Sequence, residues 1–103
     1  MLRRAEGTQI YAIKFEPDLF ELDMLDALSG LGNLEQIQLA NCSVGDDDLK
    51  RIPQLLRLTG IGLSGTRVTD AGLEHLRKFP RLRTIECDNT QITGKGLASF
   101  FIK

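Results

Sequence analysis

Apolar residues recur along this chain at intervals of 24 positions. Seven columns of positions share this period, and Lys103 is the only polar residue in any of their four rows. The first column holds Ile10, Leu34, Leu58 and Leu82, and the second holds Ile13, Ile37, Ile61 and Ile85. Self-similarity at a fixed period is typical of repeat architectures. The pattern predicts four units within one domain (1–103), over about residues 10–33, 34–57, 58–81 and 82–103.

The spacing inside each unit predicts a strand followed by a helix. The first three columns have the form L-x-x-I-x-L, which ends in the alternation of a β-strand. The last three columns recur every three residues, as at Leu73, Leu76 and Phe79, and this spacing is helical. Residues that cap a first helical turn lie between these columns, among them Asp46 and Thr69. Stacked units of this kind form a parallel sheet on one face and a layer of helices on the other.

The first unit is the least regular and the third is the most regular. The first reads "EPDLFELDML" where the others have a turn, so the start of its helix stays open. The third, from Leu58 to Leu76, reads "LTGIGLSGTRVTDAGLEHL". This segment matches L-x-x-L-x-L-x-x-T-x-V-T-D-x-G-L-x-x-L, with isoleucine for one leucine, and resembles bacterial-type members of the leucine-rich repeat family. The fourth unit departs at Cys87 and Gly94, and the second has Cys42 in place of threonine, as in cysteine-containing repeats.

The resemblance covers about residues 8–101 and has implications for both fold and function. It implies an α/β fold, a right-handed leucine-rich repeat solenoid of four 24-residue strand–turn–helix units with its parallel sheet on the concave face. Proteins of this family bind other proteins through that face. We therefore expect a non-catalytic protein–protein interaction module. The alternative is a structural subunit or fragment that docks end-on into a larger repeat array or complex.

The glycine-rich stretch 60–65, "GIGLSG", has the G-x-G-x-x-G spacing of dinucleotide-binding sites, with Glu86 downstream where such sites place a carboxylate. That motif must follow a strand and open directly into a helix. In the 24-residue register Gly60 and Gly62 are outward positions of the third strand, and the helix signal begins only near Asp70. We therefore expect no nucleotide and no other cofactor.

The outward strand positions form the candidate partner-binding site. The third strand carries the smallest residues, which predicts close approach of a partner's backbone or bulky side chain. A solvated polar face that binds nothing is the alternative. The candidate residues are Lys14, Glu16, Gln36, Gln38, Gly60, Gly62, Ser64, Thr84, Glu86 and Asp88.

The residues that often carry chemistry fit structural roles here. Cys42 and Cys87 fall in inward columns two units apart, roughly 10 Å or more by strand spacing, so we expect both to be reduced and buried. His75, the only histidine, is expected to face solvent beside Ser99, where no cleft supports a catalytic triad. We expect no catalytic residue and no enzyme activity.

Charged residues gather at the two ends of the predicted helices. The run Asp46–Asp48 lies at a helix start, where carboxylates cap the first turn, and it lacks the alternation of a calcium loop, so no metal is expected. Basic residues at the other end complement the helix dipole and offer a basic rim to an acidic partner. With a net charge of −1 and no interleaved aromatic residues, nucleic acid is not expected. The basic residues are Arg51, Arg57, Arg77, Lys78, Arg81 and Arg83.

Composition and the two ends complete the sequence-based expectations. The chain is 42% hydrophobic and 26% charged, as in globular domains, and no apolar run approaches the roughly 18 residues of a membrane span. The start "MLRRAEGTQIYAI" does not resemble a signal peptide, so we expect a cytoplasmic protein that does not bind membranes. The edge of the fourth strand is covered by a continuing chain, by another chain, or by Phe100, Phe101 and Ile102 acting as a cap. We expect some self-association through that edge.

Overall fold

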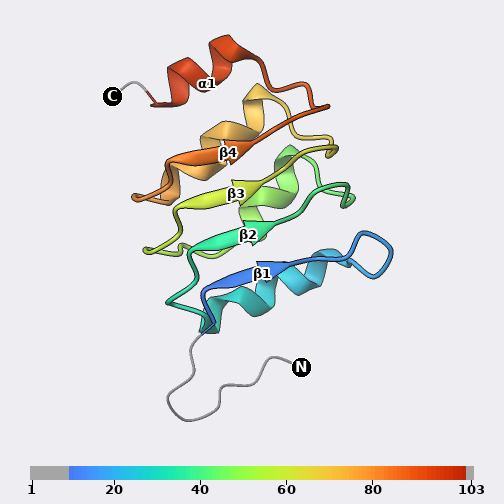
Figure 1. Cartoon of the computed structure of the whole chain (residues 1–103), viewed down its shortest axis with the longest axis vertical. Coiled ribbons are helices and arrows are strands. Elements are labelled where there is room, and N and C mark those ends of the chain that lie inside the picture. The colour runs from blue at the N-terminus through green and yellow to red at the C-terminus, as the bar shows by residue number, and fades with distance from the viewer. Residues whose placement is uncertain (1–9, 102–103) are drawn as a thin grey trace.

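The computed structural model describes residues 10–101. Residues 1–9, Ile102 and Lys103 lie outside the described residues, so the start of the chain and the contribution of Ile102 to a cap stay predictions. Strands and helices alternate along the chain (Figure 1). In order they are β1 (Ala12–Lys14), η1 (Leu22–Gly30), β2 (Gln36–Gln38), η2 (Asp46–Arg51), β3 (Gly60–Gly62), η3 (Asp70–Lys78), β4 (Thr84–Glu86) and α1 (Gly94–Phe101).

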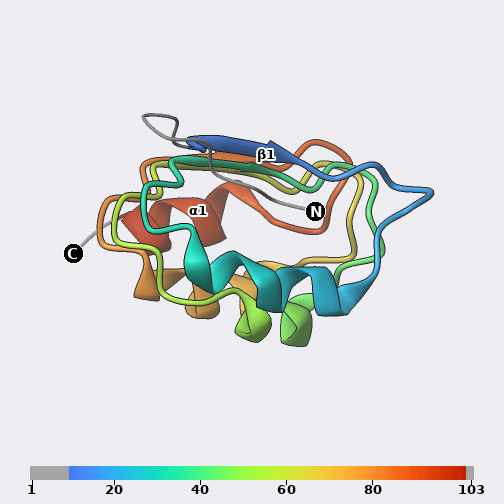
Figure 2. The same cartoon turned by 90° about the horizontal axis from the view of Figure 1, so that it is seen from below.

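The strands form a single parallel sheet in the order β1-β2-β3-β4. Ile13 of β1 pairs with Ile37, Ile37 pairs with Ile61, and Ile61 pairs with Ile85, so each strand lies 24 residues after its neighbour. Among the described residues, the helices all lie on one face of this sheet (Figure 2). The predicted α/β arrangement, with a four-stranded parallel sheet and a layer of short helices, is therefore confirmed.

The apolar columns form the core between the two layers. Every column residue of the second and third rows, from Leu34 to Phe79, is at most 3% exposed. In the first and fourth rows several are only partly buried, including Ile13, Phe15, Ile85 and Leu97. The inner rows have a neighbouring strand on both sides, whereas β1 and β4 each pair with one strand.

Three of the helices are 3₁₀ helices and the last is an α-helix. A 3₁₀ helix has three residues per turn, so Leu73, Leu76 and Phe79 point in the same direction, into the core. The three-residue spacing does not distinguish the helix types, because Leu97 and Phe100 have the same spacing in the α-helix of the fourth unit. In the first unit, whose boundary was open, the helix begins at Leu22 after Glu21 in an extended conformation.

Candidate protein-binding face

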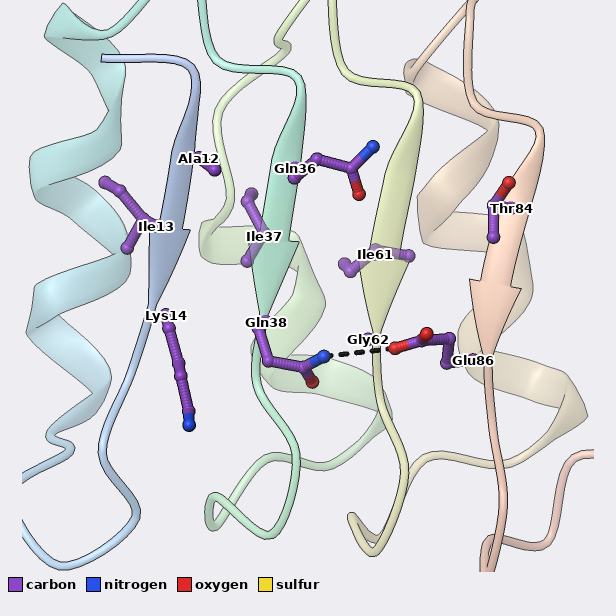
Figure 3. Close-up of a pocket in the computed structure, with 10 residues that line it drawn as sticks. All are labelled: Ala12, Ile13, Lys14, Gln36, Ile37, Gln38, Ile61, Gly62, Thr84 and Glu86. Carbon is purple, nitrogen blue, oxygen red and sulfur yellow. Dashed lines mark hydrogen bonds between the residues drawn. The ribbon is translucent and has the colours of Figure 1, made fainter.

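The outward strand residues lie on the face of the sheet that is turned away from the helices, which we call the open face (Figure 3). A shallow hollow of ≈ 340 Å³ extends over all four strands of this face. Six of the ten predicted binding residues line it: Lys14, Gln36, Gln38, Gly62, Thr84 and Glu86. The alternation of side chains along a strand places these residues outward while the isoleucine between them packs inward.

The other four predicted residues lie under or beside the hollow. Gly60 is buried beneath the side chain of Gln36. Ser64 and Asp88 follow their strands and are joined, because the Asp88 N–H donates to Ser64 Oγ at 3.1 Å. Glu16 follows β1 and is exposed. The structure therefore brings most of the predicted set together and leaves Glu16, Ser64 and Asp88 at one margin.

Two glutamine side chains of β2 cover the glycines of β3. Gln38 Nε2 donates to Glu86 Oε1 at 3.0 Å across β3, and Gln38 Oε1 accepts the Ala40 N–H at 2.9 Å (Figure 3). Side-chain atoms of Gln36 and Gln38 occupy the places where a Cβ of Gly60 or Gly62 would be. The chain's own glutamines therefore fill the space above the third strand in this structure, and the close approach of a partner there stays a prediction.

Charge is divided across the open face. Lys14 lies on β1, is exposed, and forms no ion pair or hydrogen bond through its side chain with any described residue. Glu86 lies on β4, three strand spacings away, or roughly 14 Å at the usual separation of about 4.8 Å. A partner that lies across the strands therefore meets a cation at one side and an anion at the other.

Aspartates at the helix starts connect neighbouring units. Asp46 accepts hydrogen bonds from the Thr69 backbone N–H and hydroxyl, both at 2.7 Å. Asp70 accepts the same two from Thr93, at 2.8 and 2.7 Å. The hydrogen bond from the Thr93 N–H, and to a lesser extent the one from its hydroxyl, lowers the pKa of Asp70 below its ordinary value. We call each Asp–Thr pair an aspartate clamp.

The predicted helix-capping role is correct for Asp48 and wrong for Asp46. Asp48 accepts the Gly45 N–H at 2.8 Å and so caps the start of its own helix. Asp46 instead binds the next unit, and Asp47 forms an exposed ion pair with Lys50 at 3.6 Å. The Thr69 hydroxyl caps η3 by accepting the Ala71 N–H at 3.2 Å.

The two cysteines are free and differ in exposure. Cys42 is 2% exposed and its thiol donates to the Phe15 carbonyl at 3.7 Å. Cys87 is only half-buried, so its predicted burial is wrong, because β4 has a neighbouring strand on one side only. Burial raises the pKa of both thiols, aided by the negative charge of Glu16 at Cys42 and of Asp88 at Cys87.

His75 is half-buried, which corrects the expectation that it faces solvent fully. In residues 10–101, no group of three or more His, Cys, Asp or Glu side chains is placed to hold a metal ion. The helices of the same region are too short and too polar for any of them to span a bilayer.

The predicted basic rim divides into paired and unpaired residues. Lys78 Nζ donates to the Leu49 carbonyl at 3.0 Å, at the end of η2, and burial lowers its pKa. Arg51 lies 3.7 Å from Asp26, and Arg77 lies 3.0 Å from Glu74. The side chains of the other three, Arg57, Arg81 and Arg83, are exposed and unpaired within the described part of the chain.

Comparison with known proteins gives no relative from which a role could be transferred. No protein-family model matches the chain, and no curated protein matches it. The case for a function therefore rests on the open face and the surfaces beside it.

Proposed function

We propose that the chain is a leucine-rich repeat solenoid that binds another protein through the open face of its sheet, without catalysis. The observation that carries the proposal is the hollow of ≈ 340 Å³, lined by both polar and apolar residues, over four strands in 24-residue register with helices on the opposite face. In such a solenoid this face is the concave one. The repeat motif of Leu58–Leu76 supports the same assignment.

The open face is organised before a partner arrives. Both polar atoms of the Gln38 amide are already hydrogen-bonded, and Gln36 Nε2 donates to Thr59 Oγ1 at 3.3 Å. Side chains held in place in the free protein lose less conformational entropy on binding. Lys14 and Glu86 at opposite sides favour a partner segment that carries both an acidic and a basic residue.

The proposal is tested by affinity capture from a lysate of the source organism with the wild-type chain and the Gln38→Lys/Ser64→Arg variant. Both substitutions add positive charge to the open face, so we expect a partner retained by the wild type to be lost. Ala71→Lys/Ala98→Arg adds the same charge at exposed helix positions and serves as the control. Circular dichroism confirms that each variant is folded. Equal retention of every captured protein by all three chains would contradict the proposal.

End-on docking is a second candidate, and the fourth row of the core favours it. Ile85, Ile92 and Leu97 are partly buried, whereas their counterparts Ile61, Val68 and Leu73 are at most 2% exposed. Burying this apolar surface against another chain, a second copy included, is favourable. Sedimentation velocity over a concentration series should show reversible association that Gln38→Lys/Ser64→Arg leaves intact. A single monomeric species at all concentrations would exclude self-association through β4.

A further inference from the structure

Two loops run side by side where the helices end and the next strands begin. Gln54 Nε2 donates to the Lys78 carbonyl at 3.2 Å, and the Arg83 N–H donates to the Thr59 carbonyl at 3.0 Å. These contacts join the loops 54–59 and 78–83 at both ends. Residues 24 apart between the contacts are therefore neighbours, which places Arg57 beside Arg81.

Arg57, Arg81 and Arg83 are exposed, and their side chains make no ion pair or hydrogen bond within residues 10–101. By contrast, Lys50, Arg51, Arg67 and Arg77 each lie within 4.0 Å of a carboxylate. The helix dipole does not account for the unpaired arginines, because its effect falls off within the last turn and η2 ends at Arg51. Neighbouring like charges repel, so Arg57 and Arg81 contribute nothing favourable to each other in the free protein.

A small hollow lined by Arg77 and five apolar residues lies against the same loop. It has a volume of ≈ 100 Å³ and is lined by Arg77, Phe79, Pro80, Leu82, Phe100 and Phe101. Pro80 and Leu82 flank Arg81, and Leu82 is followed by Arg83, so Arg81 and Arg83 adjoin the hollow in the chain. Leu56, which precedes Arg57 in the chain, is 59% exposed, and Phe101, which lines the hollow, is 43% exposed.

We propose that this surface docks an acidic protein segment that carries one bulky apolar side chain. The edge patch, as we call it, consists of Arg57, Arg81, Arg83 and this hollow. Carboxylates of the segment pair with the arginines, which are suited to bidentate contact with carboxylates. The apolar side chain enters the hollow, which has room for one side chain and not for a stack of bases.

The edge patch is independent of the open face. It is built from the loops that precede β3 and β4 and from the end of α1, whereas the open face depends on Lys14, Gln38 and Glu86. The net charge of −1 gives the whole chain no general attraction to polyanions, so an acidic protein segment is favoured over nucleic acid.

The test uses a short fluorescein-labelled synthetic peptide of glutamates and aspartates around one phenylalanine. Fluorescence anisotropy with the full chain should show binding that weakens about tenfold or more, roughly 1.4 kcal/mol or more, in Arg57→Glu/Arg81→Glu. Lys50→Glu/Arg67→Glu makes the same change in net charge at other exposed sites and should stay within about twofold of the wild type. A peptide with serine for phenylalanine should also bind more weakly. Amide resonances of Leu82, Phe100 and Phe101 should shift on binding.

Four results would overturn the proposal. The first is that the wild type does not bind the peptide at millimolar concentration, and the second is that the control variant loses as much affinity as Arg57→Glu/Arg81→Glu. The third is that the peptide with serine binds as tightly as the peptide with phenylalanine. The fourth is that a single-stranded oligonucleotide binds more tightly than the peptide at the same arginines. The Leu56→Ser/Phe101→Ser variant keeps every arginine and tests the apolar contribution separately. This variant should also bind the acidic peptide more weakly than the wild type. Circular dichroism verifies that all variants remain folded.

Discussion

An aspartate carboxylate in one unit leaves room only for glycine at one position of the next unit. Asp46 Oδ1 occupies the place of a Cβ at Gly72, and Asp70 Oδ1 does the same at Gly96. The aspartate, threonine and glycine of the T-D-x-G motif thus act together across two units. The second unit has Asp48 in the glycine column, and the first unit has Leu22 in the aspartate column, so no carboxylate arrives there.

This arrangement predicts the effect of one methyl group. Gly72→Ala should lower the free energy of unfolding by about 1–3 kcal/mol, because the new Cβ displaces Asp46 and meets Val68 Cγ1 at 2.9 Å. Gly30→Ala is the matched control, since no heavy atom lies within 4 Å of its Cβ position. Urea unfolding followed by circular dichroism measures both. Equal effects of the two substitutions would refute the clamp as the cause.

The clamp of Asp70 also predicts a pH dependence. Its pKa is lowered in the folded state by the Thr93 N–H and hydroxyl, so its stabilising contribution is complete above the unfolded pKa of about 3.9. That contribution is lost as the pH falls through the still lower folded pKa. The stability difference between wild type and Asp70→Asn should therefore be constant from pH 7 to about 5 and shrink below about 4. A difference that persists unchanged at pH 2.5 would contradict this account.

Sequence reasoning placed the aspartates at helix starts and missed that Asp46 and Asp70 bind the next unit. Helix-capping rules consider only nearby residues, whereas the hydrogen-bond partners of these carboxylates lie 23 residues further on. The signal was nonetheless present in the repeat alignment. Threonine and glycine occur together only in the two units that follow an aspartate of this column.

At the level of strands and helices, the 24-residue period was sufficient to predict the pairing of the sheet. The period fixes which residues are neighbours, and Ile13, Ile37, Ile61 and Ile85 pair as expected. It does not fix where a long side chain lies within its row. Gln38 therefore crosses β3 to Glu86 over a glycine that the sequence alone suggested was uncovered.

The difference between an inner and an outer strand predicts the reactivity of the two thiols. Cys87 follows β4 and is half-buried, whereas Cys42 follows β2 and is 2% exposed. An aromatic disulfide reagent at pH 8 should modify Cys87 about tenfold faster or more in the folded protein. Both should react more slowly than a free thiol, because their pKa values are raised. Cys87→Ser should remove the fast phase, and a fast phase that remains in this variant would contradict the assignment.

Residues 10–101 form a two-layer stack on which three exposed surfaces differ in composition. The open face combines amides with one cation and one anion, the edge patch combines unpaired arginines with a small hollow, and β4 leaves part of the apolar core exposed. The open face and the edge patch share no residue, so each can be changed by substitutions that leave the other intact. The sequence predicted the open face and a basic rim. It did not show which basic residues of the rim are paired, because the spacing of residues along the chain does not determine the partners of long side chains.

Site-specific photo-crosslinking tests the central claim, that the open face binds a protein, most directly. One variant carries p-benzoylphenylalanine in place of Thr84 on the open face, and a second carries it in place of Ala98 on the exposed side of α1. Each variant is expressed in the source cells. Irradiation should give a discrete protein adduct from position 84 that is missing from position 98. An adduct from position 98 alone, or the same adducts from both positions, would contradict the account.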